Sequence, residues 1–311
     1  MEGRLQIFTG NAHPELAAAI SRELEVDLGR AIVSKFKNGE TRVKLDENVR
    51  GADVFVVQST SEPVNDYIME LLLMIDALRR ASAARITAVI PYYGYAKQEK
   101  KTSGREPISA KLVANLLTTA GANRVLAIDL HSAAIEGFFD IPVDHLRATP
   151  LLARAFRARV SGDIVVVSPD AGGVGRAQDF RTRANGSLAI ISKQHPDADK
   201  TEMLDIVGDV DGKTAVIVDD MISTGGTLIE AAKLLKSRGA EKIYVCATHG
   251  IFASNALELI ADSDIDELFV TDTIRLPNDY PAKVSVVSVA PLFAEAIMRT
   301  HRGMSISALF T

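Results

Sequence analysis

The chain has 311 residues, a formal net charge of −5 at pH 7 and one cysteine. Its length predicts two domains of about 150 residues, each large enough to bury a hydrophobic core. The acidic balance argues against nucleic-acid binding as the main function, because such domains are usually strongly basic. The single cysteine, Cys246, excludes a disulfide framework and a thiolate metal cluster.

The sequence also bears on where the protein works. Its first residues lack the basic, apolar and small-residue order of a signal peptide. No apolar run approaches the length of about 20 residues that spans a membrane. We therefore expect a cytoplasmic protein that binds no membrane and no nucleic acid.

Short β-branched runs alternate with longer amphipathic runs along the chain. In the first half, strands are predicted at 5–8, 54–58, 86–90 and 124–128, and helices at 64–82 and 108–120. In the second half, a helix is predicted at 151–159 and strands at 164–167, 188–191, 215–218, 243–247 and 268–270. This alternation predicts the α/β class, with two mostly parallel sheets flanked by helices and joined by right-handed crossovers.

The boundary between the two predicted domains falls where the first alternation ends. We assign residues 1–147 to an N-terminal domain and residues 148–297 to a C-terminal domain, and we expect the tail 298–311 to pack back on the first. No low-complexity linker marks the boundary. The domains are therefore expected to pack closely and to bind ligands between them, at the carboxyl ends of strands.

The most informative segment is an apolar run that ends in Asp219 and Asp220, followed by a small-residue loop that opens onto a helix. Backbone N–H groups and hydroxyls of such a loop can bind one phosphate at the helix N-terminus. Carboxylates beside a phosphate face sugar hydroxyls or a divalent cation, which indicates a phosphorylated sugar. The weaker alternative is that the glycines only turn the chain and the acids cap the helix. The loop residues are Ser223, Thr224, Gly225, Gly226 and Thr227.

Two other strands end in polar groups suited to a polyphosphate. Asp129 and His131 follow one strand, and Asp170 follows another before a glycine-rich helix start. Imidazole and carboxylate are plausible ligands of Mg²⁺ or of bound water around a polyphosphate. Taken alone, His131 is more often a structural histidine, but the second acid-ended strand favours the cation role.

A third strand breaks at Pro91 into an aromatic and then basic loop that contains Lys97, Gln98 and Glu99. Cations and polar donors after aromatic residues suit a nucleoside triphosphate, because the cations meet phosphate and an aromatic ring can cover the base. A solvated lysine-rich loop is an equally good interpretation on local grounds.

Taken together, these motifs resemble those of the ribose-phosphate diphosphokinases, also called phosphoribosyl pyrophosphate synthetases. The resemblance runs through essentially the whole chain in the same order, whereas a phosphoribosyltransferase would account for the second half alone. The segments that carry it are 36–40, 58–61, 63–66, 91–101, 105–111, 129–131, 137–144, 168–170 and 219–227.

The resemblance implies two phosphoribosyltransferase-like domains and transfer of the pyrophosphoryl group of MgATP to the 1-hydroxyl of ribose 5-phosphate. It implies that Thr224 to Thr227 hold the 5-phosphate and that Asp219 and Asp220 hold the ribose hydroxyls. His131 and Asp170 would act at Mg²⁺ and the triphosphate. The residues implied to contact ATP elsewhere are Lys97, Gln98 and Glu99, together with Phe36, Asn38 and Glu40 at the adenine.

The resemblance further implies an obligate homo-oligomer, commonly a hexamer, because the adenine residues come from a neighbouring subunit. The polar loop 192–200 resembles the family's catalytic flap, with Lys193 and His195 in catalytic positions, although composition alone favours an idle surface loop. An arginine usually stands where this chain has His195, so charge stabilisation there becomes dependent on pH.

Residues that match the family's regulatory site are Asn48, Arg50, Ser132, Ser305 and Phe310, with phosphate and ADP as the implied effectors. The family often carries glutamines at the positions of Ala134 and Glu136, so we expect altered control by phosphate. Lys97, Asn38, Glu99 and Ser223 also depart from the usual pattern. The remaining alternative is a non-catalytic regulatory relative that binds nucleotide, against which the intact sugar loop argues.

Overall fold

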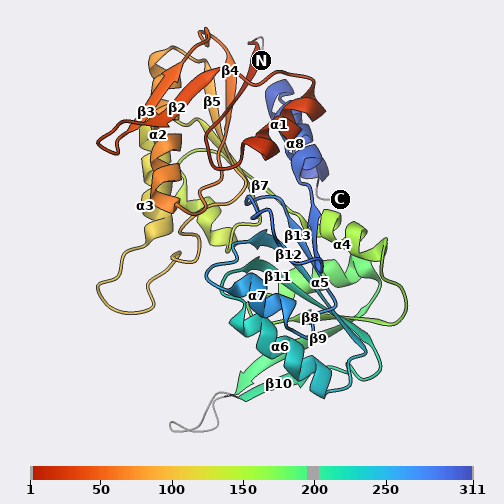
Figure 1. The fold of residues 1–311 in the computed structure, drawn as a ribbon. Coiled ribbons are helices and arrows are strands. Elements are labelled where there is room, and N and C mark those ends of the chain that lie inside the picture. Colours follow the sequence, from red (N-terminus) through yellow and green to blue (C-terminus); the bar gives the residue numbers. More distant parts are fainter. Residues whose placement is uncertain (1–2, 195–202, 310–311) are drawn as a thin grey trace. The chain divides into compact units, whose positions relative to one another are not determined.

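The structure is a computed structural model that describes residues 3–194 and 203–309, and it has the predicted α/β architecture (Figure 1). Its contacts divide the chain into two compact units. The first unit contains residues 1–147, 273–275 and 289–311, and the second contains residues 148–272 and 276–288, in each case as far as they are described.

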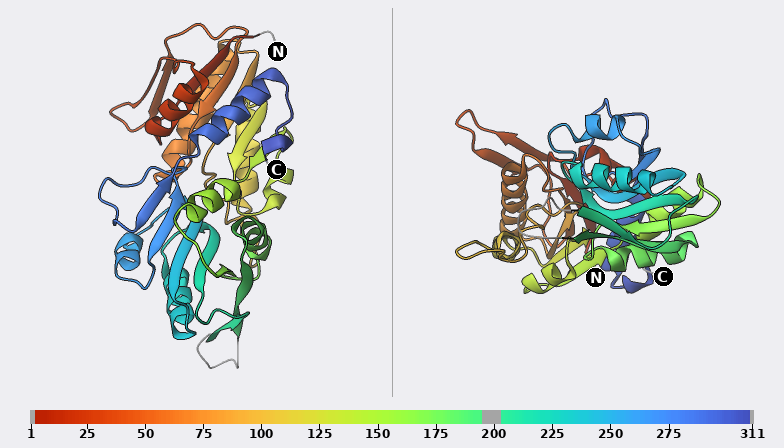
Figure 2. Two further views of the ribbon diagram at one scale, coloured as in Figure 1. Left: turned by 90° about the vertical axis from the view of Figure 1, so that its right-hand side faces the viewer. Right: turned by 90° about the horizontal axis from the view of Figure 1, so that it is seen from below.

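The first unit is built on a parallel sheet of five strands in the order β1-β4-β5-β6-β7. Helices α2 and α3 pack together on one side of this sheet, while α1 and α8 pack together on the other (Figures 1 and 2). The strands are β1 (Leu5–Thr9), β4 (Asp53–Val57), β5 (Arg85–Ile90), β6 (Arg124–Ile128) and β7 (Val143–Leu146). The helices are α1 (Pro14–Leu24), α2 (Val64–Arg80), α3 (Ser109–Ala120), α8 (Ala290–Arg302) and the short 3-10 helices η1 (Ala133–Phe138) and η2 (Ser307–Leu309).

The hydrophobic pattern accounts for these elements. Every residue of β4 is buried, as expected for a parallel strand that is covered on both faces. Helix α2 buries one stripe of apolar residues spaced three or four apart, which is the helical period. The apolar residues of that stripe are Ile68, Leu71, Met74, Ile75 and Leu78.

An antiparallel hairpin, β2 (Ala31–Lys35) with β3 (Thr41–Leu45), lies outside the main sheet and packs against α2 through β3. It is not among the predicted strands. Its residues are only partly buried, with alternating intermediate and exposed positions along β3, so it lacks the continuous apolar run by which the buried strands can be found.

The second unit is built on a sheet of seven strands in the order β10-β9-β8-β11-β12-β13-β14, parallel except for the antiparallel pair β9 and β10. Helices α4 and α5 pack together, as do α6 and α7 (Figure 1). The strands are β8 (Ile164–Ser168), β9 (Ser187–Gln194), β10 (Met203–Val207), β11 (Thr214–Ile222), β12 (Lys242–Gly250), β13 (Glu267–Thr271) and β14 (Val284–Val287). The helices are α4 (Thr149–Arg157), α5 (Val174–Ala184), α6 (Gly226–Ser237) and α7 (Ala256–Ala261).

The fold class is thus confirmed, whereas the division into domains at 147, 148 and 297 stays a prediction. The contacts assign the whole of α8 to the first unit, although its first residues, 290–297, fall within the predicted C-terminal domain. The physical reason is that α8 is one continuous helix whose buried face, including Phe293 and Ile297, packs on the first unit together with α1. Among the described residues, the longest helices are too short or too polar to cross a membrane.

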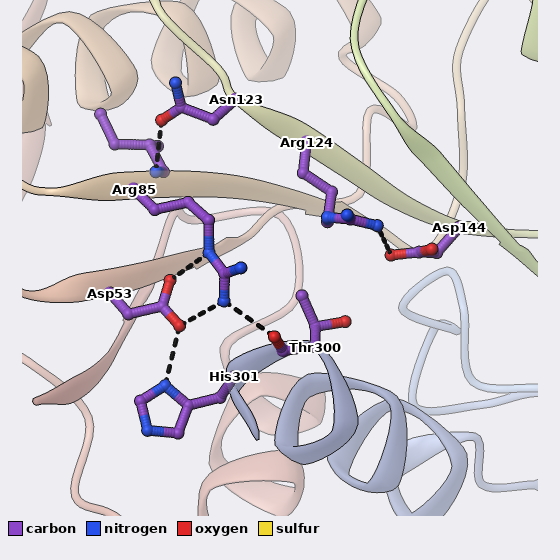
Figure 3. Close-up of polar contacts among 8 residues, drawn as sticks. Asp53, Arg85, Asn123, Arg124, Asp144, Thr300 and His301 are labelled. Carbon is purple, nitrogen blue, oxygen red and sulfur yellow. Dashed lines mark hydrogen bonds and ion pairs between the residues drawn. The ribbon is translucent and has the colours of Figure 1, made fainter. Parts of the chain in front are cut away.

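A buried ion pair joins α8 to the amino ends of the first unit's strands (Figure 3). The Asp53 carboxylate is fully buried and accepts two hydrogen bonds from Arg85, at 2.7 and 2.6 Å. Asp53 Oδ2 also lies 2.8 Å from Nδ1 of His301, and Arg85 Nη2 donates to the carbonyl of Thr300 at 2.9 Å. Because a guanidinium at a helix C-terminus satisfies a free carbonyl, Arg85 fixes both the position and the end of α8.

The substitution Asp53→Ala should lower the free energy of unfolding by about 3 to 5 kcal/mol, because it leaves the Arg85 guanidinium without its buried partner. The matched control is Asp76→Ala, which breaks the exposed Asp76–Arg80 pair on α2 and should cost less than about 1 kcal/mol. Urea denaturation of both variants measures the difference. Equal losses would show that the buried cluster contributes no more than a surface pair.

Candidate active site

The β11–α6 loop lies at the carboxyl edge of the second sheet. Its strand, β11, sits between β8 and β12 and extends to Ile222, four residues beyond the predicted end, so Asp219 and Asp220 belong to the strand itself. Gly225 is the N-cap of α6 with φ +79°, a conformation that glycine adopts without strain. No side chain caps the helix at this residue. The first N–H groups of α6 are therefore presented at a position where an anion would be stabilised.

The loop residues are presented as the sugar-phosphate interpretation requires. Thr224, Gly226 and Thr227 are exposed, and Ser223 is half-buried. The Ser223 carbonyl accepts a hydrogen bond from Ala253 N at 3.0 Å, which fixes the loop to the segment after β12. The hydroxyls and N–H groups of one short segment are thus available to a single ligand.

Arg176, in the first turn of α5, lies between the two acids. Its Nη1 is 3.2 Å from Asp219 Oδ1 and 3.5 Å from Asp220 Oδ1. The backbone N–H of Asp220 also donates to Asp219 Oδ1 at 2.8 Å. Sequence reasoning missed Arg176. A signal was present, because a cation in the first turn of a helix opposes the helix dipole and needs a nearby anion.

Burial is the largest cause that raises the pKa of Asp219, and the hydrogen bond and negative charge of the neighbouring Asp220 add to it, so that the pKa reaches about 7. The positive charge of Arg176 acts in the opposite direction and lowers this pKa. Because two adjacent carboxylates cannot easily ionise together, the pair holds a proton near neutral pH. Arg176 limits that effect and keeps the acids able to accept hydrogen bonds from hydroxyl groups.

Asp170 follows β8 at the same edge of the second unit and is exposed. Its Oδ1 accepts a hydrogen bond from Gly173 N at 2.8 Å, and Ser168 Oγ donates to its carbonyl at 2.7 Å. One carboxylate oxygen therefore closes the turn before α5, as a capping residue does. Since β8 and β11 are parallel neighbours, the second unit brings Asp170 to the edge that carries the sugar loop.

In the first unit, His131 follows β6 and the loop 91–101 follows β5, which is the neighbouring parallel strand. His131 and Lys97 are exposed, and Glu99 is half-buried and lies 3.5 Å from Lys100. Gln98 is held against the start of α3, because its Oε1 accepts from Ser109 Oγ at 2.6 Å. These predicted ATP-binding residues thus follow neighbouring strands at one edge of the first sheet.

The predicted adenine residues lie together at the tip of the β2–β3 hairpin. Phe36 is half exposed, and the Arg42 guanidinium lies 5.9 Å from the centre of its ring. Asn38 Nδ2 donates to Glu40 Oε2 at 2.9 Å, and Asn38 Oδ1 accepts from Glu40 N at 3.3 Å. An exposed ring beside ordered polar groups is suited to stacking on a base and to hydrogen bonding with its edge.

Comparisons with known proteins agree along the chain. Residues 5–121 match the family model described as the N-terminal domain of ribose phosphate pyrophosphokinase, and residues 197–311 match the phosphoribosyl synthetase-associated domain. The ribose-phosphate pyrophosphokinase of Caldanaerobacter subterraneus subsp. tengcongensis is 54% identical over 309 residues, covering 99% of this chain and 98% of that protein. The chain belongs to the ribose-phosphate pyrophosphokinase family. The enzyme of the same name from Bacillus subtilis is 49% identical over 308 residues, covering 99% of this chain and 97% of the relative.

A solved structure supports the same assignment. The crystal structure of phosphoribosylpyrophosphate synthetase from Mycobacterium smegmatis is similar with a TM-score of 0.90 at 45% identity, covering 96% of this chain and 99% of that one. The resemblance drawn from the motifs is thereby confirmed, and so is the enzyme class. The roles of the individual residues stay predictions.

Several predicted residues of this pyrophosphokinase-family chain cannot be placed. His195 and Phe310 lie outside the described residues, and the side chain of Lys193 is not described, although its backbone pairs with Leu204 at the end of β9. The other candidate effector residues are placed: Asn48 Oδ1 accepts from Arg50 N at 3.0 Å, Ser132 caps η1, and Ser305 Oγ lies 2.6 Å from Ser307 Oγ.

The substitution Arg176→Gln should move the titration of the Asp219–Asp220 pair to higher pH. The guanidinium favours the ionised form, so its removal raises the pKa of Asp219 above its present value of about 7. Carboxyl ¹³C NMR of labelled aspartate measures the apparent pKa values of the pair. Arg176→Lys is the matched control, because it keeps the charge and should keep the titration close to that of the wild type. An unchanged midpoint in Arg176→Gln would contradict the assigned electrostatic role.

Proposed function

We propose that the protein is a ribose-phosphate diphosphokinase that transfers the pyrophosphoryl group of ATP to the 1-hydroxyl of ribose 5-phosphate, giving 5-phosphoribosyl 1-pyrophosphate and AMP. The observation that carries this proposal is the continuous segment from Asp219 to Thr227. It joins two carboxylates to an uncapped helix N-terminus, and this combination suits a sugar that carries both hydroxyls and a phosphate.

In the proposed complex, the loop of the second unit binds ribose 5-phosphate. The N–H groups and hydroxyls of Thr224 to Thr227 donate to the 5-phosphate, whose charge is favoured by the dipole of α6. Asp219 and Asp220 accept hydrogen bonds from the ribose hydroxyls. Arg176 keeps these acids ionised enough to do so. The sugar is thereby held with its 1-hydroxyl oriented for attack.

ATP is assigned to the first unit. Lys97 and Gln98 contact the triphosphate together with His131, and Glu99 stands beside them. The exposed ring of Phe36, with Asn38 and Glu40, receives adenine from the nucleotide of a neighbouring subunit. This sharing requires a homo-oligomer, for which we propose a hexamer in the cytoplasm.

The metal is proposed to be Mg²⁺ that enters with ATP. Within residues 3–194 and 203–309, no three His, Cys, Asp or Glu side chains gather into a metal cluster. Mg²⁺ keeps several waters and binds through substrate phosphates and one or two protein groups, for which we propose His131 and Asp170. When bound, the ion neutralises charge on the triphosphate.

The proposed chemistry depends on positioning and charge stabilisation more than on covalent catalysis. Attack at the β-phosphorus requires the 1-hydroxyl and the leaving AMP oxygen to lie in line. Lys193 would stabilise charge on the transferring group. His195 would do so only when its imidazole is protonated, so its contribution would fall as the pH rises.

The proposal is tested by incubating the purified protein with MgATP and ribose 5-phosphate and measuring AMP together with 5-phosphoribosyl 1-pyrophosphate. We expect the two products in equal amounts. ATP binding without either product would favour a regulatory relative. Formation of a nucleotide from a base and the activated sugar would instead favour a phosphoribosyltransferase.

The substitution Lys193→Ala should lower kcat by at least about a hundredfold, because removal of one preorganised charge-stabilising group commonly costs that much. The KM for ribose 5-phosphate should stay near the wild-type value, since Lys193 is assigned to the transferring group and not to the sugar. Lys242→Ala, at the exposed start of β12, is the control and should leave both constants unchanged. Steady-state kinetics that show an unchanged kcat for Lys193→Ala would refute the assignment.

Phosphate and ADP are the proposed effectors, with control that departs from strict activation by phosphate. Glu136 contributes a half-exposed carboxylate on η1, the helix that Ser132 caps, and a negative charge there disfavours an anion. Activity without added phosphate should therefore be close to the activity with it. The assay above, repeated over a range of phosphate concentrations, measures this, and an absolute requirement for phosphate would contradict the prediction.

A further inference from the structure

We infer that His145 is a positioning residue that fixes the bend at residues 129–131, and that Glu136 orients its ring. The functional part of this inference rests on the proposed function, because it assigns to that bend the placement of His131 at the metal–triphosphate complex. His145 itself lies on β7 and is buried, so its side chain is not available to a substrate. It is not one of the site residues described above.

The side chain of His145 is 3% exposed and is engaged at both ring nitrogens. Nε2 accepts a hydrogen bond from the backbone N–H of Leu130 at 2.8 Å, and Nδ1 lies 2.5 Å from Glu136 Oε1. A ring nitrogen that accepts from an N–H cannot carry a proton, so the neutral ring bears its proton on Nδ1 and donates it to Glu136. Glu136 thereby selects the tautomer that can hold Leu130.

The surroundings favour this neutral form. Burial lowers the pKa of His145, and the positive charge of Arg147 lowers it further, while Glu136 and Asp129 act in the opposite direction. Arg147 Nη1 lies 2.8 Å from the same Nε2 and 3.8 Å from Asp129 Oδ1. Protonation of Nε2 would set it against both the Leu130 N–H and the Arg147 guanidinium.

The bend that His145 holds is an unfavourable one for its residues. Asp129 has φ +41°, in the left-handed region that non-glycine residues seldom adopt. Two hydrogen bonds from β7 fix it: Asp129 N donates to the carbonyl of Leu146 at 3.1 Å, and Leu130 N donates to His145. His131 is the next residue, so its direction follows from this bend.

Glu136 links the same ring to the helix that follows. It lies on η1, which begins immediately after Ser132, and the side chain of Ser132 caps that helix through Ala134 N at 3.2 Å. The segment from His131 to Glu136 is therefore held just before its start by the hydrogen bond of Leu130 N and at its end by Glu136. Both of these contacts are made to the imidazole of His145.

Two amide substitutions separate the contacts of His145. The amide oxygen of Gln in His145→Gln can reach the place of Nε2 and accept from Leu130 N, whereas the shorter Asn in His145→Asn reaches only the place of Nδ1 and keeps the contact with Glu136. A second pair, Glu136→Leu and Glu136→Gln, removes or retains the acceptor for the Nδ1 proton. Thermal unfolding of each variant shows which are folded, and either pair alone decides the question.

We expect His145→Asn and Glu136→Leu to raise the KM for MgATP by about tenfold, the usual effect of losing one buried hydrogen bond. The KM for ribose 5-phosphate should change by less than about twofold, because no sugar contact is lost. Binding of Mn²⁺·ATP, followed by electron paramagnetic resonance, should weaken in the same proportion as the KM rises. His145→Gln and Glu136→Gln should recover most of this loss.

The inference is overturned if His145→Asn and Glu136→Leu bind Mn²⁺·ATP as the wild type does. It is also overturned if the KM values for MgATP and ribose 5-phosphate rise together, or if the Gln variants behave like their partners, since either result describes a purely structural role. Failure of the proposed function looks different: the wild type would then form no product. In that case the Mn²⁺·ATP binding series still decides whether His145 positions His131.

Discussion

Parallel strand pairing is the constraint on which the rest of this structure depends. Parallel neighbouring strands end at the same edge of a sheet. Residues that follow different strands are therefore brought close together in space although they lie far apart in the sequence. In the second unit β8 and β11 deliver Asp170 and the sugar loop to one edge, and in the first unit β5 and β6 do the same for the loop 91–101 and His131. At the opposite edge of the first sheet, the Asp53–Arg85 pair has a structural role, because it joins α8 to the amino ends of the strands.

The site of the second unit is also shaped by a conflict between burial and charge. Two adjacent carboxylates near the end of a buried strand share a proton near neutral pH, which weakens them as acceptors for sugar hydroxyls. Arg176 limits the conflict because its positive charge lowers the pKa of Asp219, although its own place in the first turn of α5 is electrostatically unfavourable. Each unfavourable term compensates for the other, so the three side chains form one electrostatic unit that is set before any ligand arrives.

Much of the fold could be predicted because buried parallel strands need continuous apolar runs, and runs such as those of β4 and β8 are unmistakable. The β2–β3 hairpin could not be found this way, because its residues are half exposed and carry no such run. The sugar loop was visible since its residues are contiguous in sequence. Arg176 and His145 were missed because they act through residues nine or more positions away, and a contact of that kind is created by the fold and not by local pattern.

The buried ion pair that joins α8 to the first sheet has a consequence for how the protein is synthesised and folded. Asp53 meets His301, a residue 248 positions later in the chain. Domains generally fold in order as they leave the ribosome, but here the face of the first sheet that α8 covers stays open until the second unit has been synthesised. The nascent chain must therefore carry an incomplete first unit through most of translation, in which the part of the sheet under α8 is uncovered and Asp53 and Arg85 are paired only with each other.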